Sequence, residues 1–264
     1  MNTDDNPYRS PQVPAAEIAA TDSTRPESWA RYPFVSGHTR AAWTVGLLAL
    51  GIVADLLGIG STLLQVNLLN RAATIGIDED EATLNDLRQG VIGLTQSFVY
   101  IASAVAFLMW IHRAYRNLPP LGATGLKHSP GWAVGYFFIP IVNLYRPYQA
   151  AREIWLGSYP RRASDELSSY GLTPSAALVG WWWAFWLIMN FTGQISMRLT
   201  LQGESIEMLL AGSWASIVTD LISVPAAILA IMLVWGIDAN QTARHGEIVG
   251  AGPATMASPV AFNL

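Results

Sequence analysis

The sequence predicts an all-α, polytopic helical membrane protein with four full transmembrane helices and one proline-broken, partly embedded segment. Charged residues make up only 13% of the 264 residues, whereas hydrophobic residues make up 52%. An ordinary soluble protein has roughly 25% charged residues. The charge is also segregated, because five segments are almost free of it: 41–69, 91–111, 131–145, 174–197 and 208–237.

Four of these segments reach the length of about 20 apolar residues that a helix needs to cross the hydrocarbon. Many of the 11 tryptophans lie near the segment ends. Tryptophan is enriched there in membrane proteins, since its amphipathic ring sits at the interface. We expect a helical membrane domain over 41–237, with these full spans: about 43–66, 91–112, 176–196 and 211–236.

The two ends of the chain have a different composition. Residues 1–40 are polar and rich in proline, and we expect a disordered N-terminal tail there. A cleavable signal would carry its apolar stretch within the first 30 or so residues, so the first span is expected to act as an uncleaved anchor. Residues 238–264, with scattered glycine, alanine and proline, are expected to form a flexible C-terminal tail.

The third apolar segment is expected to form a broken helix over 131–157. Proline removes a backbone donor and clashes with the preceding turn, so Pro140 and Pro147 both predict interruptions. Backbone groups freed in lipid must find partners within the protein. Asn143 lies between the two prolines and could supply both a donor and an acceptor.

The distribution of Lys and Arg predicts the orientation. If segment 131–157 returns to the side from which it entered, the outside carries only Arg71, Arg88 and Arg198 of the 15 basic residues. Basic residues favour the cytoplasmic side. We therefore expect a multi-pass protein of the cell membrane with both tails cytoplasmic. The alternative is five transmembrane helices, with segment 131–157 crossing completely.

The central region carries a distinctive run of motifs. In order, they are Phe107-Leu-Met-Trp-Ile-His-Arg-Ala-Tyr-Arg-Asn117, Ser129-Pro-Gly-Trp132, Phe138-Ile-Pro-Ile-Val-Asn-Leu-Tyr-Arg-Pro147 and Glu153-Ile-Trp155. They resemble the bacterial "domain of unknown function 4328" membrane family, over roughly 43–236. The resemblance implies an integral membrane protein without an assigned activity. The residues that match its pattern are Trp110, Arg113, Asn117, Trp132, Pro140, Asn143, Pro147, Glu153 and Trp155.

Asp55 and Asp220 are the two charged residues inside expected spans. An intramembrane carboxylate is unfavourable, so it is by default a candidate functional group. Each lies on a helix face of small or polar residues, which permits close helix packing. We expect both to face the bundle interior, and Asp55, Asp220 and Asn143 form the candidate intramembrane polar site. The structural alternative is that each aspartate is protonated or hydrogen-bonded across a helix pair.

Two further groups have alternative interpretations. Arg113 and Arg116 at the end of the second span favour a cytoplasmic stop, and the alternative is that one of them pairs with Glu153 and docks the broken segment. The Trp181-Trp-Trp183-x-x-Trp186 cluster could form a cation cage. Its position at the start of a span favours an interfacial anchor instead.

Several kinds of chemistry have no support in the sequence. There is no cysteine and no pair of histidines at ligand spacing, so we expect no metal site and no cofactor. Nucleotide-binding and hydrolase motifs are also missing, and we expect no enzymatic activity. The net charge of −4 gives no basic excess, which argues against nucleic acid as a partner.

The expected function is a non-enzymatic structural or regulatory role in the cell envelope. The alternative is a small transporter or channel that uses Asp55 and Asp220 in a polar intramembrane path. An intramembrane enzyme is a third hypothesis, which would require the two carboxylates to lie close enough to act as an acid/base pair. The lipid bilayer is the expected partner, and the candidate protein partners are a second copy of the chain or another membrane protein.

Overall fold

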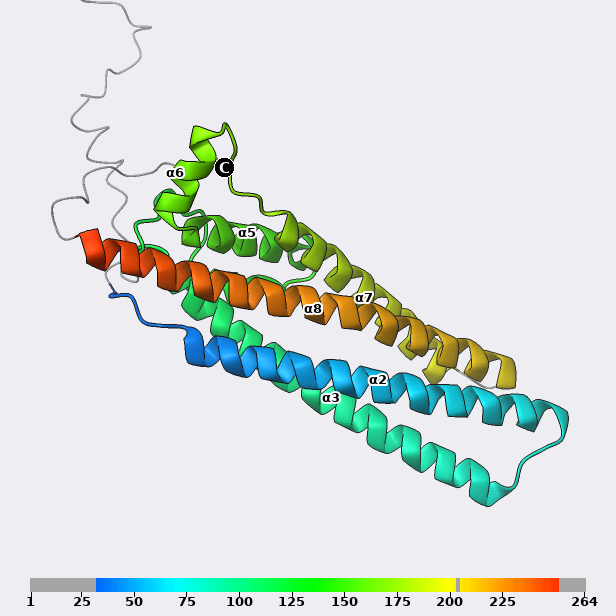
Figure 1. Cartoon of the computed structure of the whole chain (residues 1–264). Helices are drawn as coiled ribbons and strands as arrows, with labels where there is room; N and C mark the ends of the chain where they lie inside the picture. The colour runs from blue at the N-terminus through cyan, green and yellow to red at the C-terminus, as the bar shows by residue number, and fades with distance from the viewer. Residues whose placement is uncertain (1–31, 203–204, 252–264) are drawn as a thin grey trace, which may run out of the picture.

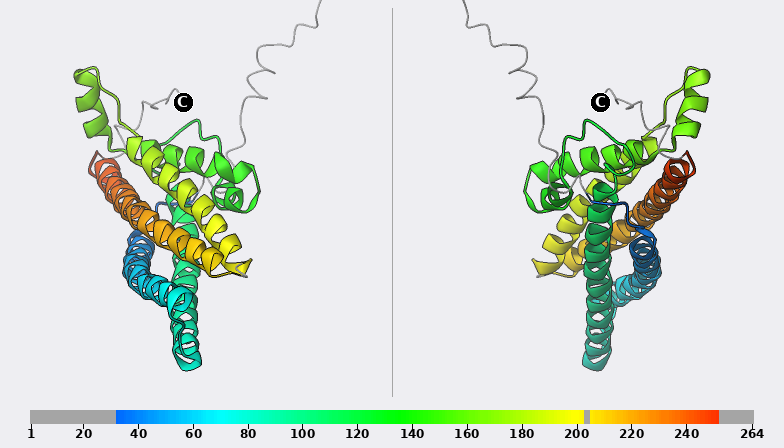
Figure 2. Two further views of the ribbon diagram at one scale, coloured as in Figure 1. Left: turned by 90° about the vertical axis from the view of Figure 1, so that its right-hand side faces the viewer. Right: turned by 90° about the vertical axis from the view of Figure 1, so that its left-hand side faces the viewer.

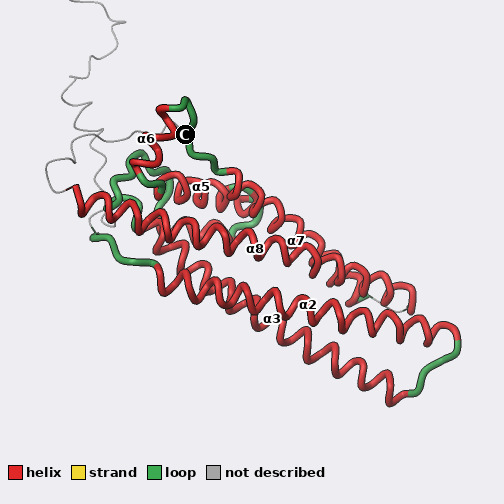
Figure 3. The backbone as a smooth tube through the Cα atoms, in the orientation of Figure 1, coloured by secondary structure: helices red, strands yellow, loops and turns green. Residues whose placement is uncertain are grey.

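The computed structural model describes residues 32–202 and 205–251, and every regular element in them is helical (Figures 1 and 3). The four long helices are α2 (His38–Thr74), α3 (Glu79–Arg116), α7 (Ala177–Leu201) and α8 (Ile206–Ala251). Between α3 and α7 lie the short elements, which are α4 (Pro130–Gly135), η2 (Tyr136–Phe138), η3 (Val142–Leu144), α5 (Arg146–Ser158) and α6 (Arg161–Ser169).

The four long helices pack in the order α3, α2, α8, α7, so that α2 and α8 form the middle of the arrangement. Figure 2 shows the short elements gathered on the side away from α2. Of these, α5 contacts α3, α7 and α8, whereas α4 packs on α3. The start of α2 and the end of α8 lie at the same end of the bundle (Figure 1).

Within the described residues, three helices are long and apolar enough to cross a membrane: α2, α3 and α8. Helix α7 has 25 residues and carries four tryptophans together with polar Asn190 and Gln194, and it is not one of these three. The all-helical class and the apolar helices agree with the sequence analysis. Helices α2 and α3, with 37 and 38 residues, are longer than the roughly 20 residues that a helix needs to cross about 30 Å of hydrocarbon.

Segment 131–157 is a helix, a break and a second helix, as Pro140 predicts. The break runs through η2 and η3, and Ile141 has a positive φ of 68°, a conformation that non-glycine residues rarely adopt. Asn143 lies inside this break, in η3. The expectation for Pro147 was wrong, because it does not interrupt a helix. It stands in the first turn of α5, where a missing N–H is tolerated.

The expected flexible tail from residue 238 also needs correction, because α8 continues to Ala251. Asp238, Gln241 and Arg244 look like tail residues by composition, yet all three are buried. They recur on one helix face: Asp238 contacts His38 of α2, whereas Gln241 and Arg244 contact α3, the end of α5 and the loops that follow these two helices. These contacts keep the last turns of α8 helical. At the other end, helix α2 includes residues 38–40 of the expected N-terminal tail. Residues 1–31 and 252–264 of the two tails lie outside the described residues.

The hydrophobic core is concentrated where α5 meets the long helices. It includes fully buried Ile111, Ile154 and Leu233. Helix α5 approaches α8 closely at Gly236, where a β-carbon would lie 2.8 Å from Cζ3 of Trp155. Only glycine permits this contact without movement of the indole. The position of α5 therefore depends on the missing side chain at residue 236.

Two glycines of α8 give a matched test of this contact. Gly236→Ala should lower the free energy of unfolding by about 1–3 kcal/mol, because its methyl group would overlap Trp155. Gly246→Ala meets no atom within 4 Å and should instead stabilise the helix by up to about 1 kcal/mol. Unfolding in detergent micelles, followed by tryptophan fluorescence, measures both. Equal effects of the two substitutions would contradict the packing of α5 on α8.

Candidate functional site

The structure brings Asp55 of α2 and Asp220 of α8 together through Gln96 of α3. The Gln96 amide nitrogen lies 3.5 Å from an oxygen of each carboxyl group, so these two oxygens are no more than twice that distance apart. A side-chain amide has two N–H donors, so one glutamine can contact both carboxyls. The Ser223 hydroxyl also hydrogen-bonds to Asp55. Both aspartates thus face other helices, as the stripes of small residues predict.

Gly58 allows the three helices to approach this closely. A β-carbon at residue 58 would lie 2.9 Å from an Asp220 oxygen and would also overlap the Gln96 amide. The small residue on the Asp55 face of α2 therefore makes room for the carboxyl group of another helix. Among the described residues, neither Asp55 nor Asp220 forms an ion pair with a basic side chain.

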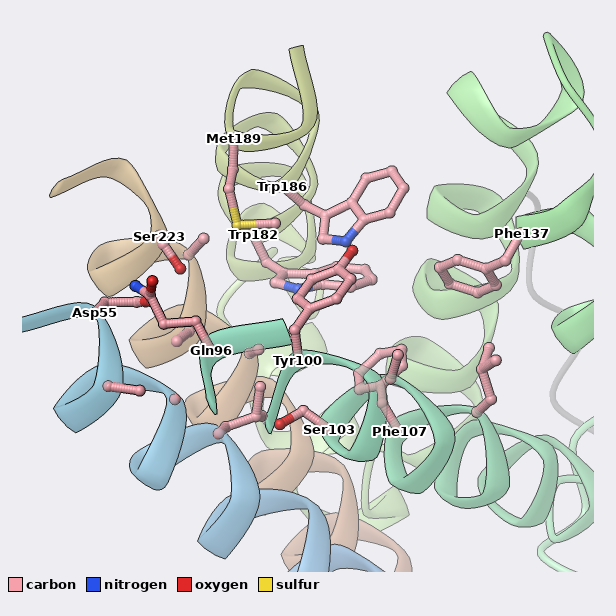
Figure 4. A pocket seen from close by; sticks show the side chains of 18 of the residues that line it. Asp55, Gln96, Tyr100, Ser103, Phe107, Phe137, Trp182, Trp186, Met189 and Ser223 are labelled. Atoms are coloured by element: carbon pink, nitrogen blue, oxygen red, sulfur yellow. The ribbon is translucent and has the colours of Figure 1, made fainter. Parts of the chain in front are cut away.

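A cavity of about 300 Å³ extends from this cluster between the long helices and η2 (Figure 4). Asp55, Gln96 and Ser223 form its polar end. Its remaining wall is mostly apolar apart from Ser103 and combines small and aliphatic side chains with aromatic ones, among them Tyr100, Phe107, Phe137, Trp182 and Trp186. Asp220 contacts Gln96 from outside this wall. The cavity therefore has one carboxylate at one end and an apolar body.

The tryptophan cluster of α7 is divided between two environments. Trp182 and Trp183 are buried, whereas Trp181 is exposed. The Trp182 ring centroid lies 5.5 Å from that of Phe107, and Trp186 stacks on Trp183 at 4.6 Å. Trp181 alone has the exposure of an interfacial anchor. The others form an aromatic layer inside the bundle, which the interpretation of the whole cluster as an anchor did not predict.

Asn143 does not join the aspartates. It lies in η3, apart from the residues that line the cavity, and its buried Oδ1 has no hydrogen-bond partner among the described residues. The sequence analysis instead missed Gln96 as the bridging residue. A mid-span amide in the otherwise apolar segment 91–111 was the available signal, because an amide there also needs partners.

The family-motif residues mostly build the end of the bundle that holds α4 and α5. Trp110 is buried in the core. The Asn117 amide donates to the Val35 carbonyl at 2.9 Å and to the Gln241 side chain at 3.0 Å. It thereby ties α3 to the segment before α2 and to the end of α8. Of the other aromatic motif residues, Trp132 is exposed, whereas Trp155 packs against the core and donates its indole N–H to the Ser175 carbonyl.

Glu153 is buried in a polar cluster with Tyr115 and the loop before α4. Its carboxylate accepts a hydrogen bond from the Lys127 backbone N–H at 2.8 Å and also contacts the Tyr115 hydroxyl. The proposed pairing of Glu153 with Arg113 or Arg116 is therefore wrong. A tyrosine hydroxyl and a backbone N–H satisfy the carboxylate, and the Arg116 guanidinium lies over the Tyr32 ring, 3.7 Å from its centroid.

Arg244 is the largest buried side chain with a charge at this end of the bundle. It is almost fully buried, and it donates to the carbonyls of Leu121 at 2.7 Å and Tyr159 at 2.8 Å. Glu247, one turn further along α8, accepts the backbone N–H groups of Arg161 and Arg162 at the start of α6. The end of α8 thus fixes the loops around α5 and α6 through backbone hydrogen bonds.

His128, beside Tyr115, should make stability depend on pH. Burial lowers the pKa of His128 below its ordinary 6.5, and the nearby Glu153 carboxylate opposes that shift only in part. The folded protein then binds a proton less readily than the unfolded chain, so stability is full above pH 6.5 and falls as the pH drops through the window below it. Apparent Tm measured from neutral to acid pH should show a smaller fall for His128→Gln. Equal falls in both proteins would contradict this role.

Comparison with known proteins identifies the family. The family model described as "Domain of unknown function (DUF4328)" matches residues 73–239. The match includes all the motif residues, Gln96 and Asp220, but it begins at the end of α2 and so excludes Asp55. No curated protein and no solved structure shows significant similarity to the chain. Since the match extends over more than half of the sequence, the chain belongs to the DUF4328 family.

Proposed function

We propose that the chain is a non-enzymatic, regulatory, multi-pass membrane protein that binds a proton or a small cation at the Asp55–Gln96–Asp220 cluster. The observation that carries this proposal is the sharing of one neutral amide by two carboxyls from different helices. Two adjacent carboxylates in an apolar environment repel each other, and burying an uncompensated charge is unfavourable. A bound proton or cation would reduce both penalties.

The placement of the two carboxyls favours binding over catalysis. A general acid/base pair needs both groups within reach of the reacting atoms. Asp55 lines the cavity, whereas Asp220 reaches the cluster from behind Gln96. One carboxyl thus faces the cavity, which suits a ligand better than a two-residue acid/base mechanism.

Transport is the second candidate function, and the cavity is the observation that favours it. The cavity adjoins a carboxyl that could exchange a proton, which is an arrangement found along intramembrane ion pathways. Asn143, however, lies apart from it, so the expected polar path through all three residues is not continuous. This separation favours a ligand-binding regulatory role over a channel.

Four membrane spans are proposed, with α7 as the fourth. Its 25 residues are enough to cross the bilayer, and it packs along α8. The segment from α4 to α6 lies at the end where α2 begins and α8 ends, which supports its return to the same side (Figure 1). The 12 basic residues on that side then support a cytoplasmic location of both tails in the cell membrane.

Cysteine labelling can test this topology, because the chain contains no cysteine. Ile75 and Tyr170 are exposed at opposite ends of the proposed spans. A membrane-impermeant maleimide should label Ile75→Cys in intact cells, but should label Tyr170→Cys only after permeabilisation. Labelling of Tyr170→Cys in intact cells would support the five-span alternative. A reporter fused after Leu264 should give a cytoplasmic signal.

Infrared spectroscopy can test the shared proton or cation. At neutral pH and without added cations, the wild type in lipid should show the band of a protonated carboxylic acid, which Asp55→Asn or Asp220→Asn should remove. Asp86→Asn, an exposed carboxyl on α3, is the matched control. If either cluster variant leaves the spectrum unchanged and no added inorganic cation perturbs the carboxylate bands, the binding proposal fails.

Flux measurements separate the two candidate functions. Proteoliposomes with an internal pH dye and an imposed potassium diffusion potential should show no more proton entry than empty liposomes if the role is regulatory. Proton entry that the Asp55→Asn/Asp220→Asn double variant abolishes would favour transport instead.

A further inference from the structure

The cavity beside Asp55 combines a carboxylate with aromatic walls, and these two features suit one class of ligand. We propose that it binds an amphipathic organic cation, with the ammonium group at Asp55 and an apolar body between the rings. This inference deepens the proposed function, on which it rests for the cation-binding end. It adds the chemical class of the ligand and the side chains that select it.

The polar end of the cavity favours positive charge. Asp55 is an acidic lining residue, and the lining contains no lysine, arginine or histidine. Asp220 adds a second negative group behind Gln96. An anion at this end would meet two carboxyl groups without a basic partner, whereas an ammonium group would be a counterion for them. The charge at this end of the cavity therefore favours a cation over an anion of the same shape.

The walls supply the faces that an organic cation prefers. Tyr100, Trp182 and Trp186 lie around the middle of the cavity, with Phe107 and Phe137 further from Asp55 (Figure 4). Aromatic rings attract cations through their negative faces, and tryptophan does so most strongly. Aromatic side chains beyond the carboxylate would therefore accept both the substituents of the ammonium group and the attached apolar body.

Small side chains on the opposite wall create the space. Helix α8 contributes Ala226, Ala227 and Ala230, and helix α2 contributes Gly51 and Ala54. The volume of about 300 Å³ lies at the lower end of the range for ligand sites, which suits a ligand the size of one ring with a substituted ammonium group.

Ser103 provides an independent indication of a ligand. Its side chain lines the cavity, the residue is only 7% exposed, and its hydroxyl oxygen has no hydrogen-bond partner among the described residues. Buried hydroxyls are normally hydrogen-bonded. A serine in a helix commonly bonds to a carbonyl of its own preceding turn, as Ser97 does at 2.7 Å. A polar atom of an occupant would satisfy the Ser103 hydroxyl.

The cavity is accessible from the side of the bundle. Tyr100 and Phe138 both line it, and they are 52% and 71% exposed. In the proposed topology these two exposed side chains face lipid, where an amphipathic cation accumulates. We therefore infer entry from the bilayer, with the charged group moving inward to Asp55.

Benzyltrimethylammonium is a suitable probe, and neopentylbenzene is its uncharged isostere. Equilibrium dialysis against the protein in lipid nanodiscs, with empty nanodiscs subtracted, should show saturable binding of the cation. Asp55→Asn should weaken that binding at least about tenfold, because it removes the Coulombic attraction of the counterion but keeps the shape of the side chain. The isostere should bind at least about tenfold more weakly than the cation to the wild type.

A second pair of variants tests the aromatic wall. Trp186→Leu should weaken binding by about threefold or more, whereas Trp186→Phe, which keeps a ring, should retain most of it. Asp86→Asn is the control for overall charge. Each variant must keep the wild-type Tm, and Trp186→Phe keeps the test interpretable if Trp186→Leu does not fold.

The proposal is overturned if the cation shows no saturable binding, if the isostere binds equally well, or if Asp55→Asn binds as the wild type does. The infrared measurement is independent of these outcomes. A carboxylic acid band that depends on Asp55 and Asp220, without benzyltrimethylammonium binding, would refute this inference and leave the proposed function intact. Cation binding that survives in Asp55→Asn, with no carboxyl band and no inorganic-cation effect, would refute both.

Discussion

The structure depends on one constraint: polar groups placed among apolar helices must find partners within the protein. Hydrocarbon offers no water to a backbone or side-chain group, and packed apolar residues exclude it in the same way. The chain satisfies this constraint at two levels of the bundle. At one end, Tyr115, Asn117, Gln241 and Arg244 connect α3, α8 and the loops. Deeper inside, Gln96 contacts Asp55 and Asp220.

These two polar regions differ in the groups that surround their charges. Around Arg244 and Glu153, backbone carbonyls and N–H groups supply partners, although Nη2 of Arg244 has none among the described residues. This region is a structural joint that holds α5 and the break at Pro140. The aspartate cluster instead places two carboxyls beside one neutral amide and one hydroxyl, at the end of a cavity. Two carboxyls beside a cavity that no basic side chain lines are the physical basis of the proposed function.

The sequence analysis located the break and the two aspartates but misjudged how the helices end. Pro140 marks the break because its ring and missing N–H disfavour a continuing helix locally, whereas Pro225 lies inside α8 without ending it. The end of α8 could not be predicted in this way. Asp238 and Arg244 resemble tail residues until their partners are placed beside them, which are His38 of α2 for Asp238 and two loop carbonyls for Arg244. The partner of Glu153 was out of reach for the same reason, since opposite charge offered an arginine as one alternative, whereas Tyr115 and a backbone N–H occupy the space.

The sequence by itself determined the all-helical class, the apolar segments, the family and the two aspartates that lie inside apolar segments. Such aspartates need partners within the protein. These properties depend on composition and on neighbours a few residues apart. The tertiary structure alone decided that Asp55 and Asp220 meet at Gln96, that Asn143 lies elsewhere, and that Trp182 and Trp186 of α7 line a cavity. Those relations depend on the packing of helices distant in the chain, where a residue such as Gly58 sets how closely two side chains approach.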